Sequence, residues 1–224
     1  MGVLALSLVA AASGAAWARL AAWRAGERRG GFSLYALLGG TAAFGLALVA
    51  YEAAARAGAD LRWDRLARGD SAAFLLAFAI GLVEEGAKLI GLLLVVERGI
   101  RTRTALAAAT GVASGFSALE TIAVLGQDPG AVAFLRAALG PVGHALLAVP
   151  VALAIAPALR RPRRAASLAL PLLASATLHG AGDLGLALPG SRLTFAVALA
   201  APAIILFARG RRRRATAAPL PTWK

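Results

Sequence analysis

Long apolar stretches separated by short polar linkers make up most of this chain. A helix rises about 1.5 Å per residue, so about 20 apolar residues cross the roughly 30 Å hydrocarbon core of a bilayer. The pattern therefore predicts an all-α fold, a polytopic transmembrane helical bundle of about seven spans. We place these spans near residues 2–22, 33–54, 72–96, 104–125, 131–157, 165–187 and 191–208.

The composition agrees with an integral membrane protein. Hydrophobic residues make up 59% and charged residues 16% of the 224 positions, which is more apolar surface than a soluble domain could bury. The chain has no cysteine, so disulfides, thiolate metal sites and a cysteine nucleophile are excluded. The first basic residue is Arg19, so the N-terminal stretch lacks the charged start of a signal peptide and we expect a retained first span.

Clustered arginine residues give the chain its net charge of +13, and the clusters occupy every second linker. This arrangement is typical of cytoplasmic loops and does not favour nucleic-acid binding. The positive-inside rule places the N-terminus outside and the C-terminus in the cytoplasm. We expect one transmembrane domain at residues 1–209 and a basic cytoplasmic tail at 210–224. The other basic linkers are 23–32, 97–103 and 158–164, and the mixed or nearly uncharged ones are 55–71, 126–130 and 188–190.

Two segments depart from the simple alternation of spans and linkers. Gly140 and Pro141 predict an irregular helix start shortly before His144. The linker 55–71 mixes apolar residues such as Trp63 with charges of both signs. It fits either an amphipathic segment on the outer membrane surface or an ordinary solvated loop.

The third predicted span carries two adjacent carboxylates and an ammonium in its middle, Glu84, Glu85 and Lys88. A central membrane carboxylate costs roughly 2.5 to 3.5 kcal/mol, so the pair costs about 5 to 7 kcal/mol. Spacings of three and four residues place these side chains on one helix face, which must look into the bundle or a wet cavity. A purely structural Glu–Lys clasp is the simpler alternative, but one lysine does not neutralise two carboxylates.

Further ionisable residues lie in three other predicted spans. Glu120 is in the fourth, His144 in the fifth, and His179 and Asp183 share one face of the sixth. Singly, His144 could be an interhelical hydrogen bonder and His179 with Asp183 a mutual clasp. Their combination with the acidic pair on four helices favours a functional site inside the membrane.

The ordered set of motifs resembles the PrsW-type intramembrane proteases, relatives of the type II CAAX prenyl endopeptidases and the broader CPBP membrane proteases. The resemblance covers residues 81–185. It implies an intramembrane endopeptidase of the bacterial plasma membrane that cleaves membrane-anchored proteins such as anti-sigma factors. The motifs are Glu84-Glu85-x-x-Lys88, Gly115-Phe116-x-x-x-Glu120, a helix opening with His144, and His179-x-x-x-Asp183.

Peptide hydrolysis needs a base for water, donors for the oxyanion and an acid for the leaving amine. Two adjacent carboxylates in low dielectric do not both ionise easily, so one can hold a proton while the other acts as base. We predict Glu84 as the base, Glu85 as its partner and Lys88 as the stabilising cation. His179, oriented by Asp183, would donate to the oxyanion, while His144 and Glu120 complete the water site and Phe116 supports it.

A metal-dependent route stays open. His144, His179, Glu120 and Asp183 could hold a divalent ion such as zinc. The chain has only two histidines and no His-Glu-x-x-His helix. Water activation by glutamate without a cofactor is therefore the favoured prediction.

Other classes of membrane protein compete with this reading. Carboxylates and histidines in a membrane also form the relays of proton- or ion-coupled transporters, although the chain shows no internal repeat. A non-catalytic membrane scaffold is a third alternative, but such a protein would be expected to lose Glu84, His179 or Asp183. An aspartyl protease would need a second membrane aspartate, and a rhomboid-type serine site would need glycine where Val112 stands.

The predicted topology can be tested with two reporters. A reporter fused after Lys224 should lie in the cytoplasm, and one inserted near Gln127 should lie outside, because the basic linkers are expected on the inner face. Reporter activity on each side of the membrane measures both positions. Finding the two reporters on the same side would mean that the span count is wrong by one.

Overall fold

The computed structural model is mostly helical in the part it describes, residues 2–27, 30–69, 71–125, 133–160, 166–188, 190 and 192–215, and no strand occurs there. The predicted all-α fold is thus confirmed. The elements are α1 (Val3–Ala25), α2 (Gly30–Arg56), the 3₁₀ helix η1 (Trp63–Arg68), α3 (Ser71–Val95), α4 (Thr102–Leu125), α5 (Ala133–Leu147), α6 (Val149–Arg160), α7 (Ala169–Ala187) and α8 (Arg192–Ala215).

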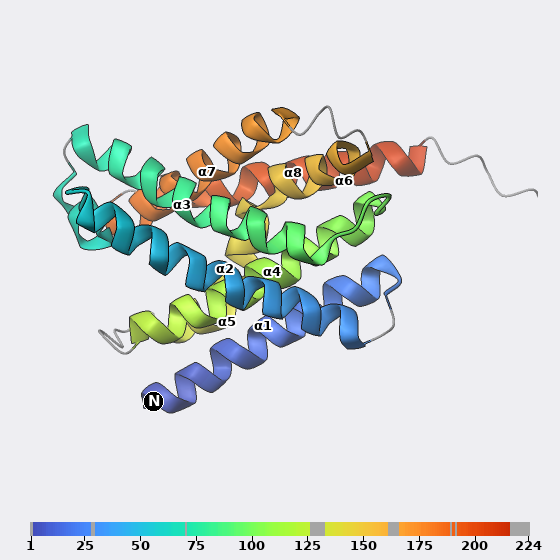
Figure 1. The fold of residues 1–224 in the computed structure, drawn as a ribbon, viewed down its shortest axis with the longest axis horizontal. Helices are drawn as coiled ribbons and strands as arrows, with labels where there is room; N and C mark the ends of the chain where they lie inside the picture. Colours follow the sequence, from blue (N-terminus) through green and yellow to red (C-terminus); the bar gives the residue numbers. More distant parts are fainter. Residues whose placement is uncertain are drawn as a thin grey trace, which may run out of the picture.

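Two groups of helices build the bundle (Figure 1). Helix α4 packs against α1, α2 and α5, while α3 pairs with α7 and α7 packs on α8. The groups join where α2 and α4 contact α3 and where α5 contacts α7. The ionisable residues singled out in the sequence lie on α3, α4, α5 and α7, and therefore along this junction.

Helix length and composition identify fewer spans than the apolar pattern predicts. In the described residues, three helical segments could cross a membrane: Val3–Ala25, Gly30–Arg56 and Thr102–Val124. A fourth is added if the bent pair Phe134–Leu147 and Val149–Arg160 forms one span. These helices support a membrane protein, whereas the seven spans, the orientation of the termini and the domain boundary at residue 209 stay predictions.

The ends of the predicted pattern fall partly outside the described residues. The linker 126–130 lies outside them, as do residues 216–224 of the predicted basic tail. The start of that tail continues helix α8, which ends at Ala215.

The predicted fifth span is divided into two helices at a different place than we expected. Helix α5 runs through Gly140 and Pro141 without a break, so the predicted irregular start before His144 is wrong. The chain instead bends by 46° between α5 and α6, at Ala148. Pro150 explains the bend, because a proline in the first turn of α6 cannot donate the backbone hydrogen bond that would continue α5.

The linker after α2 packs on the protein. In η1, Leu66 is fully buried against Ala73 and Ala77 of α3 and Leu184 of α7. Its charged residues stay exposed and pair with one another, with 2.8 Å between Arg62 Nη2 and Asp64 Oδ2. Neither predicted alternative describes this segment fully, because its apolar side faces α3 and α7 and covers their ends.

Glycine residues bring α3 and α7 into backbone contact. A Cβ atom added to Gly81 would overlap the carbonyl oxygen of Ala176, and one added to Gly180 would lie 2.7 Å from the backbone of α3. Small residues of this kind let membrane helices approach closely. Gly81 lies one turn before Glu84, and Gly180 follows His179. The glycine contact therefore determines how close those two side chains can come.

Enlarging Gly180 should separate the two helices. We expect Gly180→Ala to lower the stability of the protein by about 1 to 3 kcal/mol through overpacking. Gly182→Ala on the same helix is the matched control, because a Cβ there meets no atom within 4 Å, and it should be neutral or stabilising by up to about 1 kcal/mol. Thermal unfolding in detergent measures both. Equal stability of the two variants would contradict the close contact.

Candidate functional site

The acidic motif lies on the face of α3 that looks into the bundle. Glu84, Glu85 and Lys88 are 7%, 1% and 3% exposed, respectively. Their burial follows from the three- and four-residue spacing, which stacks the side chains on one face of the helix. Charged groups buried to this degree must be paired with one another or with neighbours.

Lys88 connects three helices through its ammonium group. Its Nζ atom lies 2.8 Å from Glu85 Oε1 and 2.9 Å from Nδ1 of His144 on α5. It also lies over the ring of Phe116 on α4, at 4.5 Å from the centroid. The distance to Glu84 Oε2 is longer, 3.8 Å. Lys88 therefore pairs mainly with Glu85, and it holds His144 in place.

His179 of α7 lies between several carboxylates. Its Nδ1 atom is 2.7 Å from Glu85 Oε1, and its Nε2 atom is 3.3 Å from Glu84 Oε2. The distance from Nε2 to Asp183 Oδ2 is 3.8 Å, as expected for two residues on one helix face. The nearest orienting carboxylate of His179 is thus Glu85, and Asp183, the predicted orienting residue, lies farther away.

A second chain of contacts leads from His144 to the edge of the site. His144 Nε2 lies 2.9 Å from Glu120 Oε2, and Glu120 Oε1 accepts a 2.6 Å hydrogen bond from Arg136. Since the Lys88 ammonium can only donate, His144 Nδ1 accepts from it and Nε2 carries the proton toward Glu120. The Arg136–Glu120 pair thereby fixes the orientation of the His144 ring.

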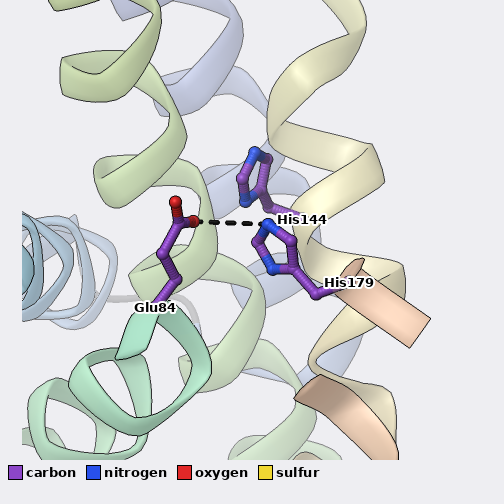
Figure 2. Close-up of side chains that lie close together, drawn as sticks. All are labelled: Glu84, His144 and His179. Atoms are coloured by element: carbon purple, nitrogen blue, oxygen red, sulfur yellow. Dashed lines mark ion pairs between the residues drawn. The ribbon is translucent and has the colours of Figure 1, made fainter. Parts of the chain in front are cut away.

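The two oxygens of Glu84 have different surroundings. Oε1 accepts a 3.0 Å hydrogen bond from the hydroxyl of Tyr51 on α2. Oε2 is buried and has no hydrogen-bond partner in the described part of the chain, since its contact with His179 lacks hydrogen-bond geometry. Figure 2 shows the Glu84 carboxylate pointing at the two histidines from the opposite side of the site.

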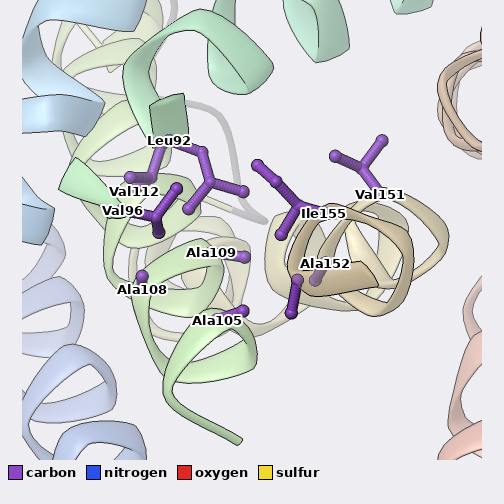
Figure 3. Packing of buried hydrophobic residues seen from close by; sticks show 10 residues of the cluster. Leu92, Val96, Ala105, Ala108, Ala109, Val112, Val151, Ala152 and Ile155 are labelled. Atoms are coloured by element: carbon purple, nitrogen blue, oxygen red, sulfur yellow. The ribbon is translucent and has the colours of Figure 1, made fainter. Parts of the chain in front are cut away.

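Apolar packing closes the site next to Lys88. Leu92, one turn farther along α3, packs with Val112 of α4 and with Val151 and Ile155 of α6, and all four are buried (Figure 3). This core offers no polar group to water. The other sides of the site are polar and are formed by Tyr51, Asp183 and the Arg136–Glu120 pair.

All the predicted site residues gather in one region, but not in equal positions. Glu84, His144 and His179 lie at its centre, whereas Glu120 and Asp183 contact the histidines from outside. Lys88 and Phe116 contact each other beside His144. The roles assigned to these residues remain predictions.

Two residues of the site are absent from the sequence prediction, Tyr51 and Arg136. Arg136 offered a usable signal, because an ionisable residue inside an apolar stretch needs a partner. Tyr51 offered little signal, since tyrosine is common near the ends of membrane helices.

The central residues have the chemistry of a metal site. One ligand atom from each of Glu84, His144 and His179 lies within 4.8 Å of the others. Two histidines and a glutamate form the ligand set of several catalytic zinc sites. The 3.3 Å between Glu84 Oε2 and His179 Nε2 also suits two ligands at about 2.0 to 2.1 Å from one tetrahedral ion. The set fits a metal, and it differs from the predicted one by including Glu84 in place of Glu120 and Asp183.

The comparisons with known proteins agree with the motif-based resemblance. Residues 29–207 match a family model described as PrsW family intramembrane metalloprotease. The chain matches no curated protein and no solved structure. The wider relationship to the CPBP proteases stays a prediction.

Removing the Lys88 ammonium should destabilise the protein strongly. Lys88→Met leaves Glu85 buried with one cationic partner fewer, and breaking a buried ion pair costs roughly 3 to 5 kcal/mol. The double variant Lys88→Met/Glu85→Gln removes both charges and should recover more than half of the loss. Thermal unfolding in detergent measures both variants, and a single variant as stable as the unaltered protein would contradict the central role of this pair.

Proposed function

This chain belongs to the PrsW family of intramembrane metalloproteases, and on that premise we propose that Glu84, His144 and His179 form the site at which it hydrolyses peptide bonds of membrane-anchored proteins. The observation that carries this proposal is the Oε2 atom of Glu84. It is a buried carboxylate oxygen without a hydrogen-bond partner in the described residues, and it faces a histidine. A base for water needs such an unoccupied oxygen.

The two glutamates of the acidic pair divide the work. Glu85 Oε1 already contacts both Lys88 and His179, so Glu85 orients and neutralises its neighbours. Glu84 Oε2 is free to accept a proton from water, and it can later return that proton to the leaving amine. This supports Glu84 as the base and Glu85 as its partner, as predicted from the sequence.

His179 can stabilise the oxyanion that forms when water attacks the peptide carbonyl. With Glu85 accepting from Nδ1, a protonated imidazole still has the Nε2 proton to donate into the site. Asp183 and Glu84 both lie on the Nε2 side of the ring. Both nitrogens of His144 already have partners, Lys88 and Glu120, so His144 shapes the wall of the water site.

A resident metal would use the same centre. Glu84, His144 and His179 would hold it, with Glu85 fixing the Nδ1 proton of His179 as an outer carboxylate often does for a metal-bound histidine. Such an ion would supply Lewis acidity toward the peptide carbonyl and activate bound water. His144 would have to exchange its contact with Lys88 or Glu120 to take part.

The burial of the site supports a substrate that lies in the membrane. Its residues are buried among apolar helices, which a segment of a membrane-anchored protein can approach from the bilayer. We propose single-span or tail-anchored membrane proteins, such as anti-sigma-factor-like regulators, cleaved in the bacterial plasma membrane. Membership of the protease family favours this function over transport, and the presence of Glu84, His179 and Asp183 favours it over a scaffold.

Glu84→Gln should abolish proteolysis, with a loss of at least about 100-fold, because the amide cannot accept the proton from water. Stability should be unchanged or higher, since a buried charge is removed. Cleavage of a single-span model substrate in detergent and thermal unfolding measure the two effects. Glu52→Gln is the control, because the Glu52 side chain is 64% exposed and pairs with Arg56. A folded, fully active Glu84→Gln variant would rule out this base.

Repeating the assay with strong chelators distinguishes water activation by Glu84 alone from metal-dependent hydrolysis. If Glu84 acts directly on water, the wild type stays active after strong chelators have removed bound metal. If chelation abolishes cleavage and zinc restores it, the reaction depends on a bound metal, for which Glu84, His144 and His179 are the candidate ligands. Metal content measured on the same samples shows whether removal was complete.

A further inference from the structure

Tyr51 links α2 to the acidic motif of α3. Its hydroxyl donates to Oε1 of Glu84 at 3.0 Å. The family motifs and the hydrolysis proposed above include no residue of α2. Tyr51 therefore contacts the proposed base, Glu84, from a helix that supplies no other residue of the site.

The ring of Tyr51 is held in place by apolar packing on two sides. It packs against the cluster around Ile80 and Leu184, and also against the cluster around Ala87 and Phe116. The chain contains one other tyrosine, Tyr35, which lies on the same helix and is 69% exposed. Tyr51 is thus anchored by its ring, and its hydroxyl has a fixed direction toward Glu84.

The other donors of the site are directed elsewhere. Lys88 is 2.8 Å from Glu85 and 2.9 Å from His144, but 3.8 Å from Glu84. Arg136 pairs with Glu120. Both Lys88 and His179 approach Glu84 on the Oε2 side, so neither holds Oε1.

We propose that Tyr51 is a positioning residue that selects Oε2 of Glu84 as the reacting oxygen. By occupying Oε1, its hydroxyl stops the carboxylate from rotating and keeps Oε2 directed at His179 and the centre of the site. This inference rests on the proposed role of Glu84, and it holds whether Oε2 takes a proton or a metal ion. Tyr51 touches Glu84 and acts through it.

Tyr51→Phe removes the hydroxyl and keeps the ring packing. The loss of a hydrogen bond to a charged group, together with a misplaced base, should lower kcat roughly 10- to 100-fold. KM should stay close to the wild-type value, while the thermal unfolding temperature should fall by a few degrees, because Glu84 Oε1 is left buried without its hydrogen bond. Tyr35→Phe, the matched control on the same helix, should change none of the three. Cleavage of a fluorogenic single-span peptide that the wild type cuts gives both kinetic constants.

An infrared measurement tests the contact without activity. Because the chain has only two tyrosines, isotope labelling of tyrosine gives two phenolic C–O bands, which the two Phe variants assign. The Tyr51 band should shift when Glu84 is changed to Gln, since its acceptor becomes a neutral amide, while the Tyr35 band stays in place. This readout needs no folded Tyr51 variant once the Tyr35→Phe spectrum has identified the remaining band.

The outcomes separate the two proposals. An active Glu84→Gln variant overturns the base itself. An inactive Glu84→Gln variant, combined with wild-type kcat in Tyr51→Phe or with a Tyr51 band that does not respond to Glu84→Gln, overturns the role of Tyr51 and leaves the base in place. A fall in kcat at constant KM together with the band shift supports both.

Discussion

The buried contact between Lys88 and Glu85 is the interaction on which the site depends. Two ions in a low-dielectric interior are stable only when their geometry is good and their remaining hydrogen-bonding groups are satisfied. Lys88 meets this condition through Glu85, His144 and the face of Phe116, and Glu85 meets it through Lys88 and His179. One ion pair thus fixes residues from α3, α4, α5 and α7, and it leaves the neighbouring Glu84 with a buried oxygen that has no hydrogen-bond partner in the described residues.

Adjacent residues of a helix point about 100° apart, and this angle lets two glutamates serve different purposes. Glu85 faces the Lys88 ammonium and Nδ1 of His179. Glu84 faces Nε2 of the same ring and the hydroxyl of Tyr51. In such an acidic pair, one carboxylate can stabilise the buried lysine, and the other is left available for a reaction. Lys88 accordingly pairs with Glu85, whereas the neighbours of the Glu84 carboxylate are His179 and Tyr51.

Charge in an apolar stretch is a strong sequence signal, and the residues found from it, Glu84, Lys88 and Glu120, do converge in the structure. Helix α3 also begins and ends within one residue of the predicted span 72–96. Contacts between distant helices were harder to predict. The hydrogen bond of Tyr51 and the pairing of His179 with Glu85 depend on how α2, α3 and α7 are placed, and no local pattern encodes that. The bend at Ala148 depends on which of two nearby prolines, Pro141 or Pro150, the packing tolerates inside a helix.

The backbone contact at Gly81 and Gly180 affects how the site responds to its lipid surroundings. Membrane helices adjust to bilayers of different thickness mainly by tilting. Two helices whose main chains touch have no compressible side chains between them, so α3 and α7 must tilt together as one unit. If α3 and α7 both cross the bilayer, as the sequence predicts, Glu84 and His179 should keep their separation when the bilayer becomes thinner or thicker.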